Sequence, residues 1–383
     1  MRDKLRVGVI GAGRWAASAH LPGFMRSPLC EVAVICDLDD GLARDRARQF
    51  GVPEYTSDYE KVLSRTDIDV IDVCTRGENH QEIAFAALEA GKHCLCEKPV
   101  AHDYRDTWRA HEIARSKSLK TKVGNTFRYA PAVQYIKALI EEGFVGTPFV
   151  FNGFEQNSQW LDPDVPIDKR ILKSRARPDV DGSDLSREGM EVFSLEGYGA
   201  PIIDMSLLMV GSNLARVSGL LANMVPWRRR TNLDISHERI NVDDTDIYLG
   251  EYQNGAICSV QSSIVTIGNY PGIEARIFGS KGAAICRLVE EHGECQRVWI
   301  ATKDAVEFRR VEIPGKFFPP GYRKGEPWNS LFYTNLIHDF MKEISEGGPK
   351  NDGDFAQSAR VQEIINAVAR SHRERRWVEV KGG

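Results

Sequence analysis

The chain has 383 residues, 42% of them hydrophobic, which is enough apolar material for the cores of two domains. Its 50 Lys and Arg residues nearly balance 54 Asp and Glu residues, and the formal net charge of −4 argues against nucleic acid or an anionic membrane as a partner. No apolar stretch approaches the length of a membrane span, and the first residues lack the pattern of a signal peptide. We therefore expect a cytoplasmic protein.

Eight cysteines are scattered along the chain. Cys36, Cys74 and Cys258 fall within apolar patterns typical of strands, and Cys94 and Cys96 lack the C-x-x-C spacing of zinc sites and redox motifs. We expect buried thiols in a reducing compartment, and we predict neither a metal site nor a disulfide framework.

The first element is a strand followed by a glycine turn and a helix. Leu5–Ile10 is a short apolar run rich in β-branched residues, and a G-x-G-x-x-A pattern begins at Gly11. Gly11 permits a tight turn, Gly13 lets the backbone approach a pyrophosphate, and Ala16 allows close packing of helix on strand. The amide groups at the start of the helix then face an anion. The alternative is an ordinary strand-to-helix turn that happens to contain glycines.

The second strand supports the first interpretation. Val32–Cys36 is again apolar and β-branched, and it ends in Asp37. An acidic side chain at this point accepts hydrogen bonds from the ribose hydroxyls of a dinucleotide and repels a 2′-phosphate, so the sequence favours NAD over NADP. Asp39 and Asp40 follow and are typical of the solvated start of a helix.

Helices and strands continue to alternate as far as residue 124. We expect helices at 41–50, 58–65, 81–89 and 104–116, and strands at 69–74, 93–96 and 122–125. This alternation predicts an α/β domain over residues 1–124, a Rossmann-type doubly wound parallel sheet with right-handed crossovers. Because ligands bind beyond the carboxyl ends of such strands, the loops at Gly11, Asp37, Thr75 and Glu97 should line one site.

From residue 125 the pattern changes, and we assign 125–383 to a second, α+β domain. Asn254-Gly255 lies between two strand patterns and is a strong hairpin signal. We expect a helix at 133–142, a large and mostly antiparallel open sheet built from 148–154, 246–252, 256–265, 274–278, 284–286, 298–302, 307–313 and 377–380, and two closing helices at 330–346 and 355–372. Residues 161–188 and 314–327 are rich in charge, proline or glycine and are read as lids or disordered loops.

Glu97-Lys98-Pro99 directly follows the strand at 93–96. Hydride transfer from a carbinol carbon requires a base for the hydroxyl proton, and Lys98 would lie beside the nicotinamide. Partial burial and the positive charge of the oxidised ring would lower a lysine pKa from its usual ~10.4 towards a useful value. The alternative is a surface Glu-Lys pair at a turn. The sequence leaves the Pro99 peptide bond open between cis and trans.

Together these motifs resemble the Gfo/Idh/MocA family of NAD(P)-dependent sugar and polyol oxidoreductases. The resemblance is carried by residues 11–16, 36–39, 51–53, His80, 90–93 and 97–99, and it is dense over residues 5–148, including 127–131 and 143–146. Farther on it is patchy, although 279–282 and the last two helices fit. It implies a second α/β domain with an open sheet used for dimer or tetramer contacts, a site between the domains, and Lys98 as a catalytic residue.

The second domain departs from the family pattern. Family enzymes usually carry an Asp, a His four residues later and an Asp three residues further on, near the start of a helix. Aligned without gaps on Asp204, the first Asp position is Gly197 and the His position is Pro201. If Asp204 instead takes the first acid position, Leu208 stands where the His should be. The histidine is absent in both registers.

Tyr198 is the nearest replacement, because a phenol both donates and accepts a proton. Its alternative is a packed aromatic side chain, and Asp204 could hydrogen-bond a substrate hydroxyl or cap its helix. Sugar contacts could also come from Trp160, Arg170, Trp227, Tyr270 and Trp328, although we expect most of these in cores or interfaces. We predict a catalytic set of Lys98, Tyr198 and Asp204, and cofactor contacts from Gly11, Gly13, Arg14, Trp15, Asp37, Thr75, His80, Glu97, Lys98 and Asn125.

The main hypothesis is an NAD-dependent dehydrogenase that acts on a hydroxyl of a sugar, glycoside or cyclitol, with NADP as second choice, assembled as a homodimer or homotetramer through the C-terminal sheet. One alternative is a hydrolase or lyase that recycles its nicotinamide through oxidation, elimination and reduction, as some relatives of this family do. Another is a non-catalytic dinucleotide-binding protein, which the missing Asp and His would suit.

Overall fold

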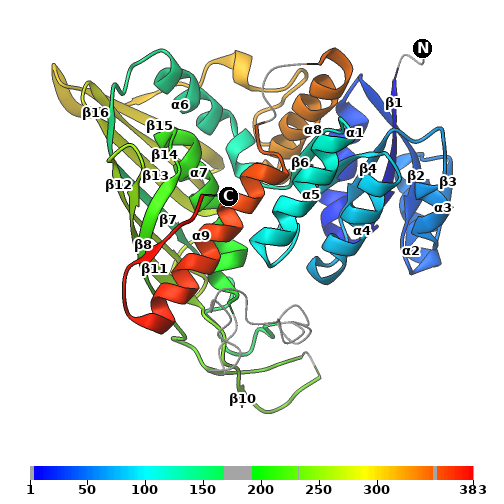
Figure 1. The fold of residues 1–383 in the computed structure, drawn as a ribbon, viewed down its shortest axis with the longest axis horizontal. Coiled ribbons are helices and arrows are strands. Elements are labelled where there is room, and N and C mark those ends of the chain that lie inside the picture. Colours follow the sequence, from blue (N-terminus) through cyan, green and yellow to red (C-terminus); the bar gives the residue numbers. More distant parts are fainter. Residues whose placement is uncertain (1–3, 168–191, 232, 348–351, 383) are drawn as a thin grey trace. The chain divides into compact units, whose positions relative to one another are not determined.

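The computed structural model describes residues 4–167, 192–231, 233–347 and 352–382. The chain forms two compact units (Figure 1), the first made of Met1–Tyr129 and Phe318–Ala359 and the second of Ala130–Phe317 and Arg360–Gly383. The sequence interpretation places the boundary at residue 124 and gives all later residues to the second domain. In the structure the returning segment Phe318–Ala359 groups with the first unit, because its helix α8 (Trp328–Glu346) contacts α1 and the helical turns beside it.

The first unit contains the predicted parallel sheet, with strand order β3-β2-β1-β4-β5-β6 and every neighbouring pair parallel. Its strands are β1 (Leu5–Ile10), β2 (Cys30–Cys36), β3 (Glu54–Thr56), β4 (Val70–Val73), β5 (His93–Cys96) and β6 (Thr121–Val123). The order reverses on either side of β1, which is the point where open α/β sheets bind ligands. The Rossmann-type prediction is confirmed.

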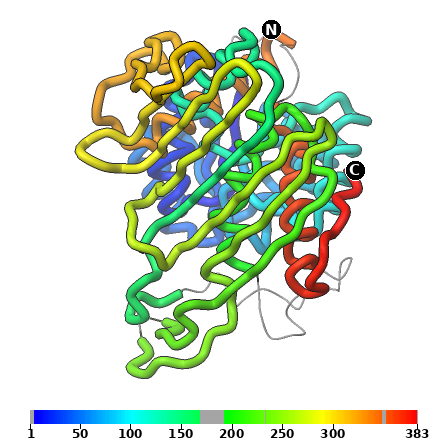
Figure 2. The backbone as a smooth tube through the Cα atoms, turned by 90° about the vertical axis from the view of Figure 1, so that its left-hand side faces the viewer, coloured from blue at the N-terminus to red at the C-terminus, as the bar shows by residue number. Residues whose placement is uncertain are grey.

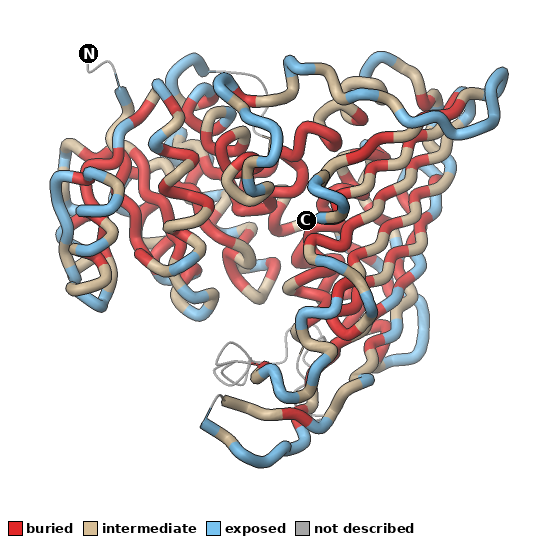
Figure 3. The backbone as a smooth tube through the Cα atoms, turned by 180° about the vertical axis from the view of Figure 1, so that it is seen from behind, coloured by how far each residue is buried: buried red, intermediate tan, exposed pale blue. Residues whose placement is uncertain are grey.

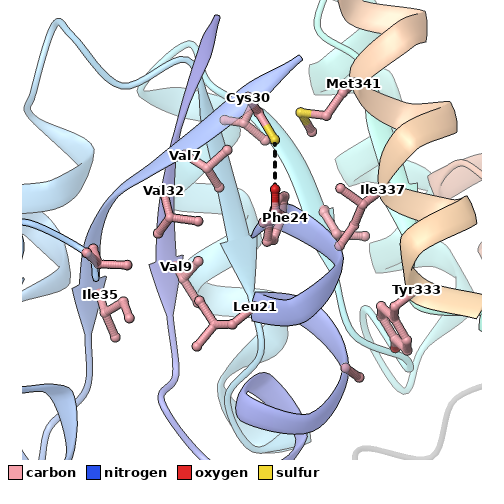
Figure 4. Packing of buried hydrophobic residues seen from close by; sticks show 14 of the residues in the cluster. Val7, Val9, Leu21, Phe24, Cys30, Val32, Ile35, Tyr333, Ile337 and Met341 are labelled. Atoms are coloured by element: carbon pink, nitrogen blue, oxygen red, sulfur yellow. Dashed lines mark hydrogen bonds between the residues drawn. The ribbon is translucent and has the colours of Figure 1, made fainter. Parts of the chain in front are cut away.

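Helices cover both faces of this sheet. They are α1 (Leu21–Arg26), α2 (Asp40–Phe50), α3 (Tyr59–Leu63), α4 (Gly77–Glu89) and α5 (Tyr104–Ser116), besides α8. One buried core joins β1 and β2 to α1, α2 and α8, and Figure 4 shows Val9 of β1, Leu21 of α1 and Ile337 of α8 within it. A second core lies on the other face, under α3, α4 and α5. Long apolar runs in β1 and β2 follow from burial on both faces.

The helix predicted at 81–89 begins earlier than expected. It starts at Gly77, after the extended Arg76, so His80 lies on its first turn and not in a loop. Glu78 in that turn complements the positive end of the helix, a signal that the sequence interpretation missed.

The second unit contains a nine-stranded sheet in the order β16-β15-β14-β13-β7-β12-β11-β8-β17. Its strands are β7 (Pro148–Gln156), β8 (Leu214–Ala222), β11 (Thr245–Tyr252), β12 (Ile257–Ser263), β13 (Gly272–Gly279), β14 (Gly282–Glu291), β15 (Glu294–Thr302), β16 (Ala305–Val311) and β17 (Val378–Glu379). Only the β7–β12 pair is parallel among those described, so the mostly antiparallel prediction is confirmed (Figure 2). The predicted hairpin joins β11 to β12, with Gly255 at φ 87°.

One face of this sheet is covered by helices. α6 (Pro131–Glu141) contacts β14 and β15, and α7 (Ala200–Val210) contacts β7 and β13. The part of α9 (Phe355–Glu374) that belongs to this unit lies on β8, where Ser371 Oγ accepts a hydrogen bond from the Gly219 amide. Buried residues alternate with less buried ones along the strands (Figure 3), as expected when one face is covered and the other is open.

Short elements complete the second unit: a two-stranded ribbon of β9 (Trp227–Arg228) and β10 (Glu238–Arg239), and a 3₁₀ turn at Gly315–Phe317 within the predicted loop 314–327. Most of the other predicted loop, 161–188, lies outside the described residues, as does Arg170. No helix in the described part of the chain is both long enough and apolar enough to cross a bilayer.

Candidate cofactor and catalytic site

The glycine turn after β1 is held between two neighbouring strands. Gly11 has φ 105°, and its amide donates to the Cys36 carbonyl at the end of β2, 2.7 Å away. A Cβ at Gly11 would overlap the Cys74 carbonyl oxygen, which follows β4. Both the backbone conformation and this close approach require glycine here.

Gly13 is glycine for a different reason. A Cβ at this position would meet no atom within 4 Å, so the backbone faces open space. A continuous helical segment begins at Arg14, runs through a π-helical turn at Ala16–His20 and continues as α1. Open space beside the amide end of a helix suits the pyrophosphate of a dinucleotide. The exposed Arg14 stands on the first turn at this end.

Asp37 is tied to the same turn. Its carboxylate accepts hydrogen bonds from the Ala12 amide at 2.8 Å and from the Asp39 amide at 3.0 Å. Arg46 of α2 donates to the Ala12 carbonyl at 3.2 Å, so both polar groups of the Ala12 backbone are engaged. A half-buried carboxylate is therefore fixed beside the glycine turn, where it can accept hydrogen bonds from ribose hydroxyl groups.

The loops after β4 and β5 are joined through His80. The ring nitrogens of His80 lie 2.9 Å from the Pro99 carbonyl and 3.2 Å from the Thr75 carbonyl. Burial lowers the pKa of His80, so the ring is neutral at neutral pH. A neutral ring has one N–H and donates to one of these two carbonyls, and the buried imidazole packs between the two loops. The Lys98-Pro99 peptide bond is cis.

Glu97 directly follows β5 and lies in a buried polar network that sequence reasoning missed. The network consists of His20, Asp72, Glu97, Tyr333 and Trp15, and we call it the His20 network. His20 Nδ1 lies 2.9 Å from Asp72 Oδ1, and His20 Nε2 lies 3.1 Å from Glu97 Oε1. Tyr333 of α8 donates its hydroxyl to Glu97, and the indole N–H of Trp15 donates to Tyr333 at 3.1 Å. Trp15, a predicted cofactor contact, thus spends its only polar group on Tyr333.

Lys98 and Asn125 border this network. Lys98 is half-buried, and its amide donates to Glu97 Oε2 at 3.3 Å. Asn125 is buried just after β6, and its amide donates to the Val123 carbonyl at 2.7 Å. The predicted cofactor residues of the first unit therefore gather at the carboxyl ends of β1, β2, β4, β5 and β6.

Two predicted catalytic residues lie in the second unit. Tyr198 sits on a π-helical turn, Leu195–Gly199, that runs directly into α7. Its ring packs edge-on against Trp160 and Tyr270, each with a centroid distance of 5.9 Å. Asp204 is buried at the fifth residue of α7, on the second turn of the helix, whose N-cap is Gly199. The suggestion that Asp204 caps the helix is therefore wrong.

The comparisons with known proteins agree with this geometry. Residues 5–125 match the NAD-binding Rossmann domain of the Gfo/Idh/MocA oxidoreductases, and residues 201–380 match their C-terminal alpha/beta domain. Levoglucosan dehydrogenase of Pseudarthrobacter phenanthrenivorans is 30% identical over 99% of this chain and 98% of its own. The chain belongs to the Gfo/Idh/MocA family.

Solved structures support the same assignment. A levoglucosan dehydrogenase in complex with NADH and levoglucosan has a TM-score of 0.84 at 28% identity, covering 99% of this chain and all of that one. An oxidoreductase domain protein from Kribbella flavida has a TM-score of 0.84 at 26% identity, again over 99% of this chain. The chain is accordingly an NAD-dependent oxidoreductase of CH–OH groups with a Rossmann domain and an open-sheet second domain.

The π-helical turn bears on the missing family residues. A π turn holds one residue more than an α-helical turn, and the acidic residue within this turn is Glu196, next to Gly197. Glu196 is buried and accepts a hydrogen bond from Gln362 Nε2 of α9 at 3.1 Å. A gap-free alignment of the sequence could not show this. The histidine remains absent.

The glycine turn yields a first prediction. Gly13→Ala should keep the melting temperature of the wild type, because the new methyl group meets no protein atom, and it should weaken NAD binding by about tenfold or more by filling the space for the pyrophosphate. Titration calorimetry with NAD measures this. Gly315→Ala is the matched control, since a Cβ there also meets nothing within 4 Å. Equal NAD affinity in wild type and Gly13→Ala would contradict the assignment.

Asp37 yields a second prediction. Asp37→Asn keeps an acceptor for the Ala12 amide but removes the charge, so NAD should bind more weakly while NADP, relieved of repulsion, loses less or gains. Dissociation constants for both cofactors measure the ratio. Asp40→Asn, at the exposed start of α2, serves as control. A variant in which both affinities change equally removes the basis for the NAD preference.

Proposed function

We propose that the chain oxidises a hydroxyl group of a small sugar, with Lys98 as the acid/base. Its relatives include a levoglucosan dehydrogenase solved with NADH and levoglucosan, one solved with NADH and L-sorbose, and D-apiose dehydrogenase of Paraburkholderia graminis, which is 26% identical over 99% of this chain. Levoglucosan, L-sorbose and D-apiose are therefore the substrates to test first. Neither glycoside cleavage nor a purely binding role draws support from these relatives.

One observation carries the role of Lys98. It follows β5 at the same edge of the sheet as the Gly11 turn and Asp37, and β1, β4 and β5 are successive neighbours in that sheet. Bound NAD supplies the hydride acceptor for oxidation. Lys98, held half-buried after the fixed Glu97, takes the hydroxyl proton in this direction and returns it in the reverse direction.

We assign substrate orientation to the second unit. Tyr198 belongs to an aromatic cluster with Trp160, Phe193 and Tyr270 that suits the apolar face of a sugar ring. Its phenol offers both a donor and an acceptor to a hydroxyl group. Glu196 on the same turn is a further candidate to bind a hydroxyl, and so is Asp204, the buried fifth residue of α7.

We also propose that a second copy of the chain covers the open face of the nine-stranded sheet, giving a homodimer or homotetramer. Exposed apolar side chains are concentrated there on three adjacent strands whose other side is packed: Leu220 on β8, Ile247 and Leu249 on β11, and Ile257 on β12. Contiguous exposed apolar surface of this kind marks protein interfaces.

The eight cysteines are free thiols and seven are buried, which supports a reducing, cytoplasmic setting.

Lys98 yields a third prediction. Lys98→Met should abolish NADH formation with every sugar that the wild type oxidises, while the NAD dissociation constant stays within about tenfold, because the change removes the proton acceptor and keeps most of the side-chain volume. Absorbance at the NADH band and titration calorimetry measure the two effects. Lys117→Met, on an exposed ion pair with Glu89, is the control. Near-normal turnover in Lys98→Met would displace this residue from the chemistry.

The open sheet yields a fourth prediction. Leu249→Glu, at a side chain 51% exposed in the middle of β11, should convert the assembly into smaller species by burying a charge in the interface. Light scattering after size exclusion measures the mass. Met25→Glu, at a side chain 44% exposed in the first unit, should leave the mass unchanged. A monomeric wild type contradicts the proposal outright.

A further inference from the structure

His20 is a histidine with no access to solvent, held between two acidic side chains. It lies on the π-helical turn Ala16–His20, and its relative exposure is 0%. Nδ1 lies 2.9 and 3.0 Å from the two oxygens of Asp72, a fully buried residue of β4, and Nε2 lies 3.1 Å from Glu97 Oε1. The proposed function gives no role to this histidine or to Asp72.

This geometry is satisfied by a ring that carries a proton on each nitrogen. A neutral imidazole has one N–H and can donate to only one of the two carboxylates, whereas an imidazolium donates to both. Burial alone lowers the pKa of His20, but the charge and hydrogen bond of Asp72, together with the neighbouring Cys74, raise it, and the pKa of His20 stands well above its ordinary value. The other ionisable groups that face the ring are Cys74 after β4, Glu97 after β5 and Tyr333 of α8, whose ring centroid lies 4.3 Å away.

The Glu97 carboxylate is fixed from several sides. Oε1 accepts hydrogen bonds from His20 and from the Tyr333 hydroxyl, and Oε2 accepts one from the backbone amide of Lys98. Gly124 after β6 presses against the carboxylate so closely that a Cβ there would overlap it. The Glu97 side chain is therefore held by hydrogen bonds and by close packing, and the Lys98 amide is hydrogen-bonded to it.

We propose that His20 is a positioning residue for the hydride transfer. One ring N–H donates to Asp72 and the other donates to Glu97, and through Glu97 the ring holds the peptide that carries Lys98. This inference rests on the proposed role of Lys98. It predicts that loss of the His20 bridge slows the chemical step without weakening the binding of either NAD or sugar, because misplacement of an acid/base by a fraction of an ångström costs rate before it costs affinity.

The kinetic test uses the full-length protein with NAD. His20→Gln removes the cation and leaves N–H donors on one nitrogen only, with a carbonyl oxygen in place of the other donor, and we expect kcat to fall by about tenfold to a hundredfold. The sugar KM and the NAD dissociation constant should stay within about threefold. The deuterium isotope effect on kcat, with substrate labelled at the oxidised carbon, should rise as hydride transfer becomes rate-limiting. An unchanged kcat, or parallel losses in kcat and in both affinities, overturns the positioning role.

Two further variants guard against a general folding defect. The double variant His20→Gln/Asp72→Asn removes one of the two carboxylates left without a cation, so it should recover part of the lost kcat relative to His20→Gln. His93→Gln is the matched control: His93 stands at the other end of β5, and its Nδ1 accepts a hydrogen bond from the Lys120 amide at 2.9 Å. His93→Gln should keep the wild-type kcat and isotope effect, and a loss equal to that of His20→Gln contradicts the proposal.

A charge measurement separates this inference from the proposed function. In protein labelled with ¹³C-histidine, the ring signal that disappears in His20→Gln should still show the protonated form at pH values well above the ordinary histidine pKa of ~6.5. His80 and His93, whose pKa values burial lowers, should lose their protons below the ordinary value and serve as references. A His20 that loses its proton near the ordinary value overturns the bridge. A wild type that binds NAD and oxidises no sugar contradicts the proposed function alone, and the ring signal still decides the bridge.

Discussion

The close contact between the Gly11 turn and the end of β4 is the constraint on which the candidate site depends. The Gly11 amide is bound to the end of β2, and the missing side chain of Gly11 lets the Cys74 backbone lie directly against the turn. The carboxyl ends of β2, β1 and β4 are thereby locked in a fixed register. Asp37 can reach the Ala12 amide and the Thr75 loop lies beside the turn only because these three ends meet.

Buried polar contacts explain why the returning helix α8 belongs to the first unit. Tyr333 donates to Glu97, and the fully buried Lys122 of β6 donates to Asp339 and Glu343 of the same helix at 2.9 and 3.0 Å. Removal of one partner from a buried ion pair leaves an uncompensated charge, so these contacts resist separation of α8 from the sheet. Along the chain, the segment Ala130–Phe317 of the second unit therefore interrupts the sequence of the first unit.

Local patterns were enough to predict the sheet of the first unit, the glycine turn, the position of Asp37 and the hairpin at Gly255, because each depends on neighbouring residues. The His20 network could not be predicted in this way. Asp72 and Glu97 face one histidine only when β4 and β5 pair in one register, and Tyr333 arrives from a helix that the sequence pattern assigned to the other domain. The π turn before α7 was equally hidden, since a single extra residue leaves the apolar pattern almost unchanged.

The two halves of the proposed chemistry meet on one helical segment. Its first residues face the open space at Gly13, and its last π-turn residue is His20, which reaches the carboxylate beside Lys98. A π turn inserts one residue and so changes the face on which every later side chain lies. Without that insertion, the amide end could still face a dinucleotide, but the imidazole would point away from the Asp72–Glu97 gap. The irregular turn is therefore best understood as the device that lets a cofactor-binding helix also hold the acid/base, which agrees with the frequent occurrence of π turns at functional sites.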